Sequence, residues 1–438
     1  MTGPREVEVW TTDTAGDRRV GTLRPSFTSG RVVASSSFEY DPGFLADGWQ
    51  ISPDLPLRAG RTYTAENSTL PGALSDAAPD DWGQKLTRAD HAHRRRGDPA
   101  LPARLGEFDY LLGVSDRTRM GALRLRGSEG APWLSDEQGV ANLRELPRIL
   151  DAARRFDLDE ATDEDIAYLG DVATSPGGAR PKANVVMDGG RLAIAKLPHS
   201  KDGRIDVERW EAVVLTIARE AGLQTPRWRL EMASDPDATR GSPRDVTDRT
   251  RSVLITERFD RDRAGLRLGY LSGRTALGLG ANDDGSRMTY EDFADVIDAR
   301  SVASAIDLAE MFGRIALTVL VNNVDDHWRN HGFLHGPAGW RLAPMFDVNP
   351  SRQRGVLDSR AISAADDPAD RRLSSLIAIA DAFRLRAPAA RSIVQRMAVA
   401  VSAWNDVAAR LAVPAEQRDL LRGAFESPQL PWALALDA

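Results

Sequence analysis

The chain has 438 residues, of which 42% are hydrophobic and 28% are charged, and its formal net charge is −7. This length exceeds what one compact core usually holds, so two or three domains are expected. The negative charge argues against broad nucleic-acid binding, although a local basic patch is compatible with it. Because the chain has no cysteine, disulfide scaffolding and thiolate–zinc sites are excluded.

The N-terminal residues show no positively charged head followed by an apolar run, so no signal peptide is expected. No apolar stretch approaches the ~20 residues that span a bilayer. The longest candidate is bracketed by Arg314 and Asn322. The sequence therefore predicts a soluble, cytoplasmic protein with no membrane partner.

Residues 1–128 predict a small α+β domain. Residues 6–40 alternate apolar and polar side chains in the manner of short strands. Residues 79–93, which begin Pro-Asp-Asp-Trp-Gly, predict a helix with an acid at its start, and three arginines at 94–96 close it. Residues 111–125 return to an apolar, strand-like pattern.

A glycine-rich segment at 174–182 follows a helical, acidic stretch at 129–170. Two strand-like stretches come next, at 183–187 and 191–197, and the second carries Lys196. Backbone N–H groups of such a segment, with a lysine on a nearby strand, can bind a polyphosphate. An ordinary flexible loop is the alternative.

Residues 207–221 predict a helix by their apolar period, with Glu211 in its first turn. Glu211 could reach the lysine of the adjacent strand, or it could be a solvated acid stabilised by the helix dipole. A further strand is expected at 252–257. From residue 290 onward the pattern is mostly helical, with long helices at 301–321 and 391–411.

Acids and amides cluster between residues 322 and 351. Asp325 and Asn330 stand five positions apart, and Asp347 follows an apolar segment at 340–346. In phosphoryl-transfer enzymes one carboxylate orients the attacking hydroxyl, while an amide and a second carboxylate hold magnesium on the nucleotide. The spacing fits that division of roles. Asp and Asn also cap helices and turns, so a purely structural role is the alternative.

Taken together, these segments resemble the HipA family, the serine/threonine kinase toxins of bacterial toxin–antitoxin systems. The resemblance covers most of the chain, and its motifs occur in order at compatible spacings. The matching segments are PDDWG at 79–83, GALRLR at 121–126, SPGGARPKA at 175–183, AIAKLP at 193–198, WEAVVLTIAREAG at 210–222, ERFDR at 257–261, NVDDHWRNHGFL at 323–334 and RLAPMFDVNPS at 341–351.

The resemblance implies an α+β, two-lobed protein-kinase-like fold with a small additional N-terminal α+β domain. It places that domain at 1–128, a kinase N-lobe at 129–260, and a mostly helical C-lobe at 261–438. It also implies roles for single residues, with Asp325 as the catalytic base and Asn330 and Asp347 as magnesium ligands. The implied nucleotide-binding residues are Gly177, Gly178, Ala179, Arg180, Lys182, Lys196, Glu211, Glu257, Arg258, Phe259, His327 and Asn330.

Within that set, the resemblance puts Lys196 on the α/β-phosphates of ATP, oriented by Glu211, and the 177–182 backbone with Lys182 over the phosphates. Residues 257–259 would contact the adenine edge, and Ser175 would be autophosphorylated. Two departures concern the loops. Val348 follows Asp347 where ordinary protein kinases have glycine, and Arg180-Pro181 replaces the residues of the family's other loop form.

The implied activity is ATP- and Mg²⁺-dependent transfer of a phosphoryl group to a protein hydroxyl, with an aminoacyl-tRNA synthetase as the expected target. The implied partner is a HipB-like helix-turn-helix antitoxin, which would supply the DNA binding that this acidic chain lacks.

Three alternatives to an active protein kinase are open. A metal hydrolase could use His327, His331 and His335 at helical spacing, but no HExxH glutamate is present and Gly332 and Gly336 would interrupt the helix. A kinase fold without turnover could sequester an antitoxin. The same fold could also phosphorylate small molecules.

Overall fold

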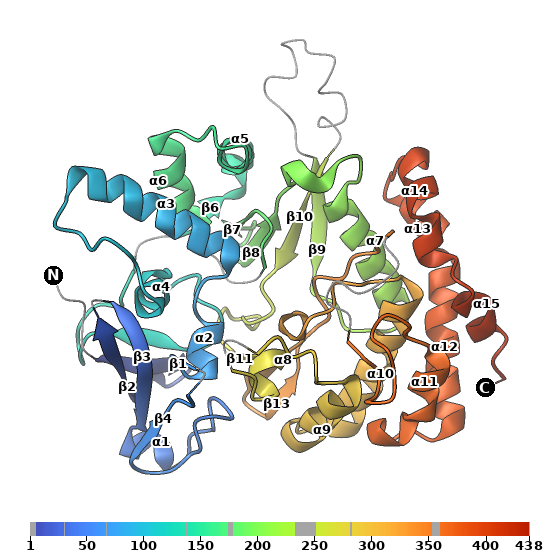
Figure 1. The fold of residues 1–438 in the computed structure, drawn as a ribbon, viewed down its shortest axis with the longest axis horizontal. Coiled ribbons are helices and arrows are strands. Elements are labelled where there is room, and N and C mark those ends of the chain that lie inside the picture. Colours follow the sequence, from blue (N-terminus) through green and yellow to red (C-terminus); the bar gives the residue numbers. More distant parts are fainter. Residues whose placement is uncertain are drawn as a thin grey trace, which may run out of the picture. The chain divides into compact units, whose positions relative to one another are not determined.

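The computed structural model describes residues 6–29, 31–66, 68–136, 139–173, 178–232, 251–280, 283–352 and 360–437. The chain folds as two compact units, which are described separately (Figure 1). The N-terminal unit comprises Met1–Lys201, Met232–Leu271 and Gly278–Asp283. The C-terminal unit comprises Asp202–Glu231, Ser272–Leu277 and Asp284–Ala438. The domain boundaries expected near residues 128 and 260 stay predictions.

The N-terminal unit begins with an antiparallel sheet in the order β4-β3-β2-β1-β5. Its strands are β1 (Val7–Asp13), β2 (Gly16–Ser29), β3 (Val32–Tyr40), β4 (Arg61–Tyr63) and β5 (Arg124–Arg126). The strands expected at 6–40 are therefore confirmed. Val7, Leu23 and Phe38 are cross-strand partners on β1, β2 and β3, and all three are buried. The short helices α1 (Pro42–Leu45) and α2 (Gly72–Asp76) follow.

The strand-like structure expected at 111–125 is wrong for most of that segment. Helix α4 (Glu107–Gly113) covers its first residues, and β5 begins only at Arg124. The apolar side chains are buried as expected, but no strand pairs the backbone at Leu111 and Val114. Instead the fully buried Arg119 donates hydrogen bonds to the carbonyls of Leu111 (2.7 Å) and Val114 (2.8 Å). A buried guanidinium thus satisfies carbonyls in the last turn and at the C-cap of α4, where intrahelical partners run out.

A second sheet of the N-terminal unit contains the strands that follow the glycine-rich segment in the chain. Strands β6 (Ala141–Asn142), β7 (Lys182–Val186), β8 (Leu192–Lys196) and β10 (Ser252–Glu257) are successive neighbours, and the expected strands are confirmed. Small residues such as Ala183, Ala193 and Ala195 face one core, and helices α3 (Asp81–Gly97), α5 (Leu146–Asp157) and α6 (Asp163–Val172) pack there. Helix was expected over 129–170, and that was wrong for its first part: the described residues 129–136 and 139–140 are not helical, and β6 follows them.

Helices make up most of the C-terminal unit. They are α7 (Val207–Glu220), α8 (Gly273–Ala276), α9 (Tyr290–Arg300), α10 (Ser304–Leu320), α11 (Leu373–Ala378), α12 (Ala387–Ser402), α13 (Trp404–Arg410), α14 (Ala415–Phe425) and α15 (Gln429–Leu434). Strands β12 (Gly332–Gly336) and β13 (Gly339–Leu342) form a hairpin. Strand β9 (Trp228–Met232) belongs to this unit except for Met232, and β11 (Gly269–Ser272) belongs to the N-terminal unit except for Ser272. Single 3₁₀ turns cover Trp328–Asn330 and Ala380–Phe383 in this unit, Leu143–Glu145 in the N-terminal unit, and Ser200–Asp202, where the chain passes from one unit to the other.

The helices expected at 207–221 and 301–321 are confirmed by α7 and α10. The single helix expected at 391–411 is two, because α12 ends at Ser402 and α13 begins at Trp404. The Trp404 ring stacks on Phe425 with 4.8 Å between centroids, and this packing accompanies the break. Within the described ranges, none of the helices is long and apolar enough to cross a membrane.

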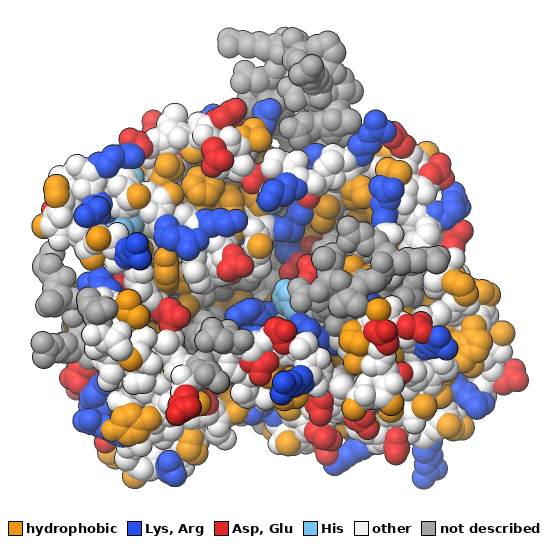
Figure 2. Space-filling view, in the orientation of Figure 1, with side chains coloured by type: hydrophobic (Ala, Val, Ile, Leu, Met, Phe, Trp, Pro, Cys, Tyr) orange, Lys and Arg blue, Asp and Glu red, His pale blue; other side chains and the backbone are white. Residues whose placement is uncertain are grey.

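Charge on the described surface is mixed. On the face shown in Figure 2, basic and acidic side chains of the described residues are interspersed. The arginines that close α3 follow this pattern, because Arg94 pairs with Asp90 and Arg96 with Asp163. Such exposed pairs add little stability, but they offset the basic cluster seen in the sequence.

Candidate functional site

The acid-rich loop of the C-terminal unit is closed at its two ends by hydrogen bonds. Asn322 Nδ2 donates to the Ser351 carbonyl at 2.6 Å, and the Ser351 N–H donates to the Asn322 carbonyl at 3.2 Å. Asn322 follows α10 with a left-handed backbone (φ 52°), which Asn adopts more readily than most residues. These bonds bring the start and end of the 322–351 segment together.

Asp325, Asn330 and Asp347 meet inside this loop. Asn330 Nδ2 donates to the Asp325 carbonyl at 3.0 Å and lies 3.5 Å from the Asp347 carbonyl. The structure thus brings together the three residues predicted as base and metal ligands. Because Nδ2 faces these carbonyls, the side-chain oxygen of Asn330 is the atom that a hard cation would contact.

Asp347 has a backbone conformation that depends on its surroundings. Its φ is 55°, and its N–H donates to Glu211 Oε1 at 3.1 Å. A left-handed non-glycine residue is uncommon and is maintained by neighbouring contacts. Glu211, which is buried on α7, supplies one such contact. The sequence predicted that Glu211 orients Lys196. That role stays a prediction, and the contact with Asp347 was not expected.

The adjacent acids Asp325 and Asp326 lie in opposite environments. Asp325 is exposed, whereas Asp326 is buried, accepts a hydrogen bond from the Tyr290 hydroxyl and lies 3.2 Å from His331 Nε2. Burial would raise the pKa of Asp326, but His331 and Tyr290 lower it to about 2. A general base must reach the substrate proton. Of the two acids, only Asp325 is placed to do so.

The histidine-based hydrolase site does not form. His327, His331 and His335 do not share a helix, because a 3₁₀ turn, Trp328–Asn330, separates the first two and His335 lies in β12. His335 packs against Trp340, and burial lowers its pKa to about 4. Across the described part of the chain, no group of three or more His, Asp or Glu side chains is placed to hold a metal ion. Mg²⁺ commonly uses one or two carboxylates with phosphates and water, so this absence does not bear on Asn330 and Asp347.

The glycine-rich segment is described from Gly178 onward, and Ser175 and Gly177 lie outside the described residues. Gly178 has a φ of 94°, which favours glycine. Lys182 is almost fully buried, and its ammonium donates to Asp80 Oδ2 (2.7 Å) and to the Gly178 carbonyl (2.8 Å). Lys196 is the direct cross-strand partner of Lys182 and is half-buried. Ala179 and Arg180 lie between Gly178 and β7.

Strand β10 ends at Glu257, and Arg258 and Phe259 follow it. The side chain of Arg258 is bound within the N-terminal unit. Its guanidinium binds Asp260 at 2.6 and 2.7 Å and the Thr118 carbonyl at 2.9 Å. Glu257 lies 3.4 Å from Arg191, and the Phe259 ring lies 6.3 Å from that of Tyr270. Adenine binding by residues 257–259 stays a prediction. At Arg258 the backbone groups would have to bind adenine, because the side chain is bound to Asp260 and Thr118.

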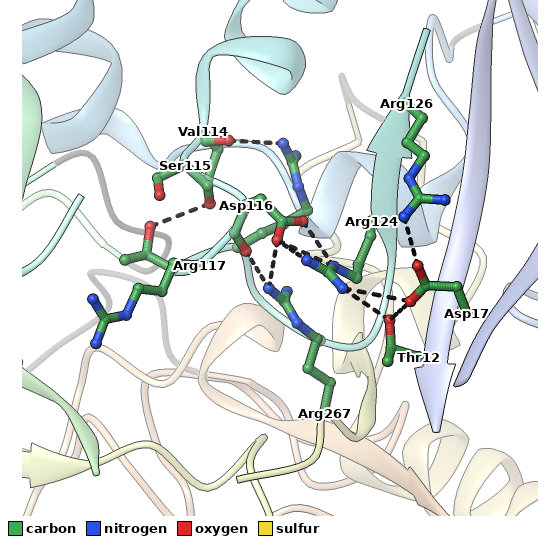
Figure 3. Close-up of polar contacts among 12 residues, drawn as sticks. Thr12, Asp17, Val114, Ser115, Asp116, Arg117, Arg124, Arg126 and Arg267 are labelled. Atoms are coloured by element: carbon green, nitrogen blue, oxygen red, sulfur yellow. Dashed lines mark hydrogen bonds and ion pairs between the residues drawn. The ribbon is translucent and has the colours of Figure 1, made fainter. Parts of the chain in front are cut away.

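Sequence reasoning missed a cluster of buried acids and arginines around this segment. Asp116 accepts from Arg124 (2.5 Å) and Arg267 (3.1 Å), and Figure 3 shows both guanidinium groups directed at its carboxylate. Burial lowers the pKa of Arg267 to about 9. Burial would raise the pKa of Asp260, but Arg258 and Arg261 hold it far below its usual range.

Two of the sequence motifs contain members of this cluster, since ERFDR includes Asp260 and GALRLR includes Arg124. Asp116 lies in neither motif, and its second partner, Arg267, is 151 positions away.

Comparison with known families supports the resemblance. A family model described as the HipA-like C-terminal domain matches residues 174–404, and one described as the HipA N-terminal domain matches residues 8–126. The first match alone covers more than half of the chain. The chain belongs to the HipA family.

Among solved structures, the fold is similar to that of a Shewanella oneidensis MR-1 complex described as the toxin–antitoxin system HipA, HipB and its operator DNA. The TM-score is 0.67 at 17% sequence identity, covering 98% of this chain and 96% of that chain. This likeness confirms the expected α+β, two-lobed kinase-like fold class. A second match, to a Helicobacter pylori proinflammatory kinase, CtkA, has a TM-score of 0.38 at 13% identity and covers 58% of this chain and 92% of that one. Comparison with curated proteins gave no match.

Proposed function

We propose that this HipA-family chain is a protein kinase that uses ATP and Mg²⁺ to phosphorylate a serine or threonine hydroxyl. The observation that carries the proposal is the meeting of Asp325, Asn330 and Asp347, which hydrogen bonds hold together in one loop. A loose phosphoryl-transfer transition state needs mainly positioning and cations near the phosphate oxygens. An exposed acid beside two oxygen ligands for a hard cation provides part of that arrangement.

In this proposal Asp325 accepts the proton of the substrate hydroxyl as that oxygen attacks the γ-phosphorus and the bond to the leaving ADP oxygen breaks. The Asn330 side-chain oxygen and the Asp347 carboxylate hold Mg²⁺, which supplies positive charge to the phosphate oxygens. Lys196 and the backbone of the glycine-rich segment bind the phosphates. The backbone of residues 257–259 binds adenine, and His327 contributes to the nucleotide site.

Glu211 acts in the same proposal through Asp347. Its hydrogen bond to the Asp347 N–H supports a left-handed backbone at the metal ligand and so fixes where the carboxylate points. Whether Glu211 also orients Lys196 is a separate part of the proposal, since the two residues belong to different units.

Two further parts of the proposal concern regulation. The protein would phosphorylate its own Ser175 in the glycine-rich segment. The phosphate group would add a charge of about −1.5 to −2, and it would compete with the phosphates of the nucleotide for the same binding groups. On incubation with ATP and Mg²⁺, the wild type should gain one phosphate on the peptide containing Ser175 and lose activity, while Ser175→Ala stays active and unmodified. A wild type that stays unphosphorylated there would refute this part.

The partner would be a HipB-like helix-turn-helix antitoxin. The Shewanella oneidensis structure contains HipB and operator DNA together with HipA, and the net charge of −7 leaves DNA binding to a partner. The protein substrate would be an aminoacyl-tRNA synthetase, as the family resemblance implies.

The kinase proposal is tested by phosphoryl transfer from radiolabelled ATP. The purified protein is incubated with a cell lysate and Mg²⁺, and labelled bands are identified by mass spectrometry. We expect a labelled protein with the wild type and none with Asp325→Asn. ATP binding without transfer to protein would instead indicate a kinase fold without turnover. Transfer to a small molecule alone would indicate a small-molecule kinase.

A further inference from the structure

A buried ion pair connects α3 with the strand that follows the glycine-rich segment. Asp80, the residue before α3, uses Oδ1 to accept from the Gly83 N–H at 2.7 Å and Oδ2 to accept from Lys182 at 2.7 Å. The side chains of Asp80 and Lys182 are only 8% and 3% exposed. A third contact runs between the same elements, because Trp82 Nε1 donates to the Lys182 carbonyl at 3.1 Å. One carboxylate therefore caps a helix and holds a lysine 102 residues away.

The same lysine holds the end of the glycine-rich segment. Its ammonium donates to the Gly178 carbonyl at 2.8 Å, while its backbone begins β7. The segment between Gly178 and Lys182 is thus closed by a side-chain bond across its own end. Figure 1 shows α3 running beside the β7–β8 hairpin, so the contact joins neighbouring elements of one unit.

Asp80 also compensates a positive charge that lies opposite another in the sheet. Lys182 and Lys196 are direct partners in the β7–β8 register, and like charges placed directly opposite each other destabilise a sheet. The Asp80 carboxylate compensates the charge of Lys182. Burial raises the pKa of Asp80, and the nearby ammonium of Lys182 opposes that rise. A buried charge of either sign would be costly without the other.

We propose that Asp80 is a positioning residue for the glycine-rich segment: through Lys182 it holds the Gly178 carbonyl and fixes the end of the segment at β7. Lys182 is then a structural cation rather than a ligand of the phosphates, and Lys196 is the lysine that serves the nucleotide. The start of α3 in this way sets nucleotide affinity. The role of Lys196 and this last step rest on the proposed kinase function, whereas the role of Asp80 in holding Lys182 and Gly178 does not.

Hydrogen exchange of the nucleotide-free protein tests the structural part. Asp80→Asn keeps a good helix cap but removes the charge, and Lys182→Met removes the ammonium at similar length. Each should speed exchange of the Lys182–Val186 amides by about tenfold or more, because one buried charge loses its partner. The double variant should show less than the product of the two effects.

The matched control is Asp165→Asn, which breaks the ion pair with Arg155 at the start of α6 in the same unit. It should leave exchange of the β7 amides unchanged. Wild-type exchange of these amides in Asp80→Asn would overturn the proposal. Should Asp80→Asn fail to fold, the double variant decides: it is expected to fold, because no buried charge is left alone. A double variant as unfolded as the single would count against the pair.

ATP affinity separates positioning from direct binding. If Lys182 positions the segment, Asp80→Asn and Lys182→Met weaken ATP binding by similar factors, and the double variant is no worse than their product. If Lys182 binds phosphate directly, Asp80→Asn frees its charge and leaves affinity unchanged or higher, while Lys182→Met lowers it. That second pattern would overturn the proposal. A wild type that binds no ATP would refute the kinase function, while the exchange result would still decide the role of Asp80.

Discussion

In the C-terminal unit the acids predicted to act on substrate and metal lie on a loop, where Asp325 is exposed and Asp347 half-buried. In the N-terminal unit, Lys182 and Arg258 are charged residues of the predicted nucleotide motifs. Both are buried and bound to acids from the same unit. The backbone positions the first group, through the bonds of Asn322, Asn330 and Glu211. Opposite charges position the second. A charged residue in a functional motif can therefore be a reactive group or a structural one, and burial with a partner distinguishes the two.

The largest effect is expected at Asp325. Asp325→Asn keeps the shape of the side chain but removes the base, so phosphoryl transfer should fall by about 10²–10⁴-fold. The free energy of unfolding should stay within about 0.5 kcal/mol of wild type, because the residue is exposed. Transfer rates and urea denaturation measured on the same preparations check both statements. A variant that keeps more than a tenth of the wild-type rate would show that another residue is the catalytic base.

The neighbouring variant Asp326→Asn should show the reverse pattern, in which the free energy of unfolding falls and phosphoryl transfer is not the main loss. With a folded-state pKa of about 2, against an ordinary value of 3.8, the charged carboxylate contributes about 2–3 kcal/mol of stability. Because the folded-state pKa is the lower one, this stability is present above about pH 4 and is lost as the pH falls toward 2.

Urea denaturation of wild type and variant between pH 3 and pH 7 measures this difference. The two curves should converge at the acid end, where Asp326 is protonated. A variant as stable as wild type at pH 7, yet inactive, would reverse the assignment of the two acids.

A smaller effect, on nucleotide binding, is expected at Asp347. Asp347→Ala should weaken Mg²⁺-dependent ATP binding by about 10–100-fold, because the amide of Asn330 alone holds a hard dication poorly. Asp347→Asn is the matched control for the backbone, since Asn tolerates the left-handed conformation (φ 55°) that strains Ala. Both variants should lose the Mg²⁺ dependence, measured by titration with ATP at several Mg²⁺ concentrations. If only Asp347→Ala loses it, the backbone rather than the carboxylate is responsible.

Local patterns predicted much of the fold. The strand expected at 252–257 is β10 with the same bounds, and the apolar period at 207–221 located α7. The pattern at 111–125 predicted burial correctly but not structure, because the segment begins in the last turn of α4 and the buried Arg119 binds the carbonyls there. Apolar periodicity carries no information on which polar group will satisfy the backbone.

Some contacts of the candidate site could also be predicted from the sequence, and others could not. The spacing of Asp325 and Asn330 could be read from the sequence because both lie within one short loop. The bond from Asp347 to Glu211 could not, since it joins a backbone N–H to an acid 136 positions away. Asp80 was read only as the start of a helix, because its second partner, Lys182, is 102 positions away in the chain. The roles of these residues in catalysis stay predictions.

The smallest effect, and the one that sharpens the comparison most, is expected at Glu211. This buried acid accepts a hydrogen bond from the Asp347 N–H of the acid-rich loop, and two variants separate its possible roles. Glu211→Gln keeps an oxygen for the Asp347 N–H but loses the charge, whereas Glu211→Ala loses both. If Glu211 acts through Asp347, the Gln variant should lose only about 2–5-fold in turnover and the Ala variant about tenfold, with little change in the KM for ATP. If it acts by charge on Lys196, Gln and Ala should be equally impaired and the KM for ATP should rise in both. Steady-state kinetics with varied ATP distinguishes the two, and equal impairment would place Glu211 with the charge-positioned residues.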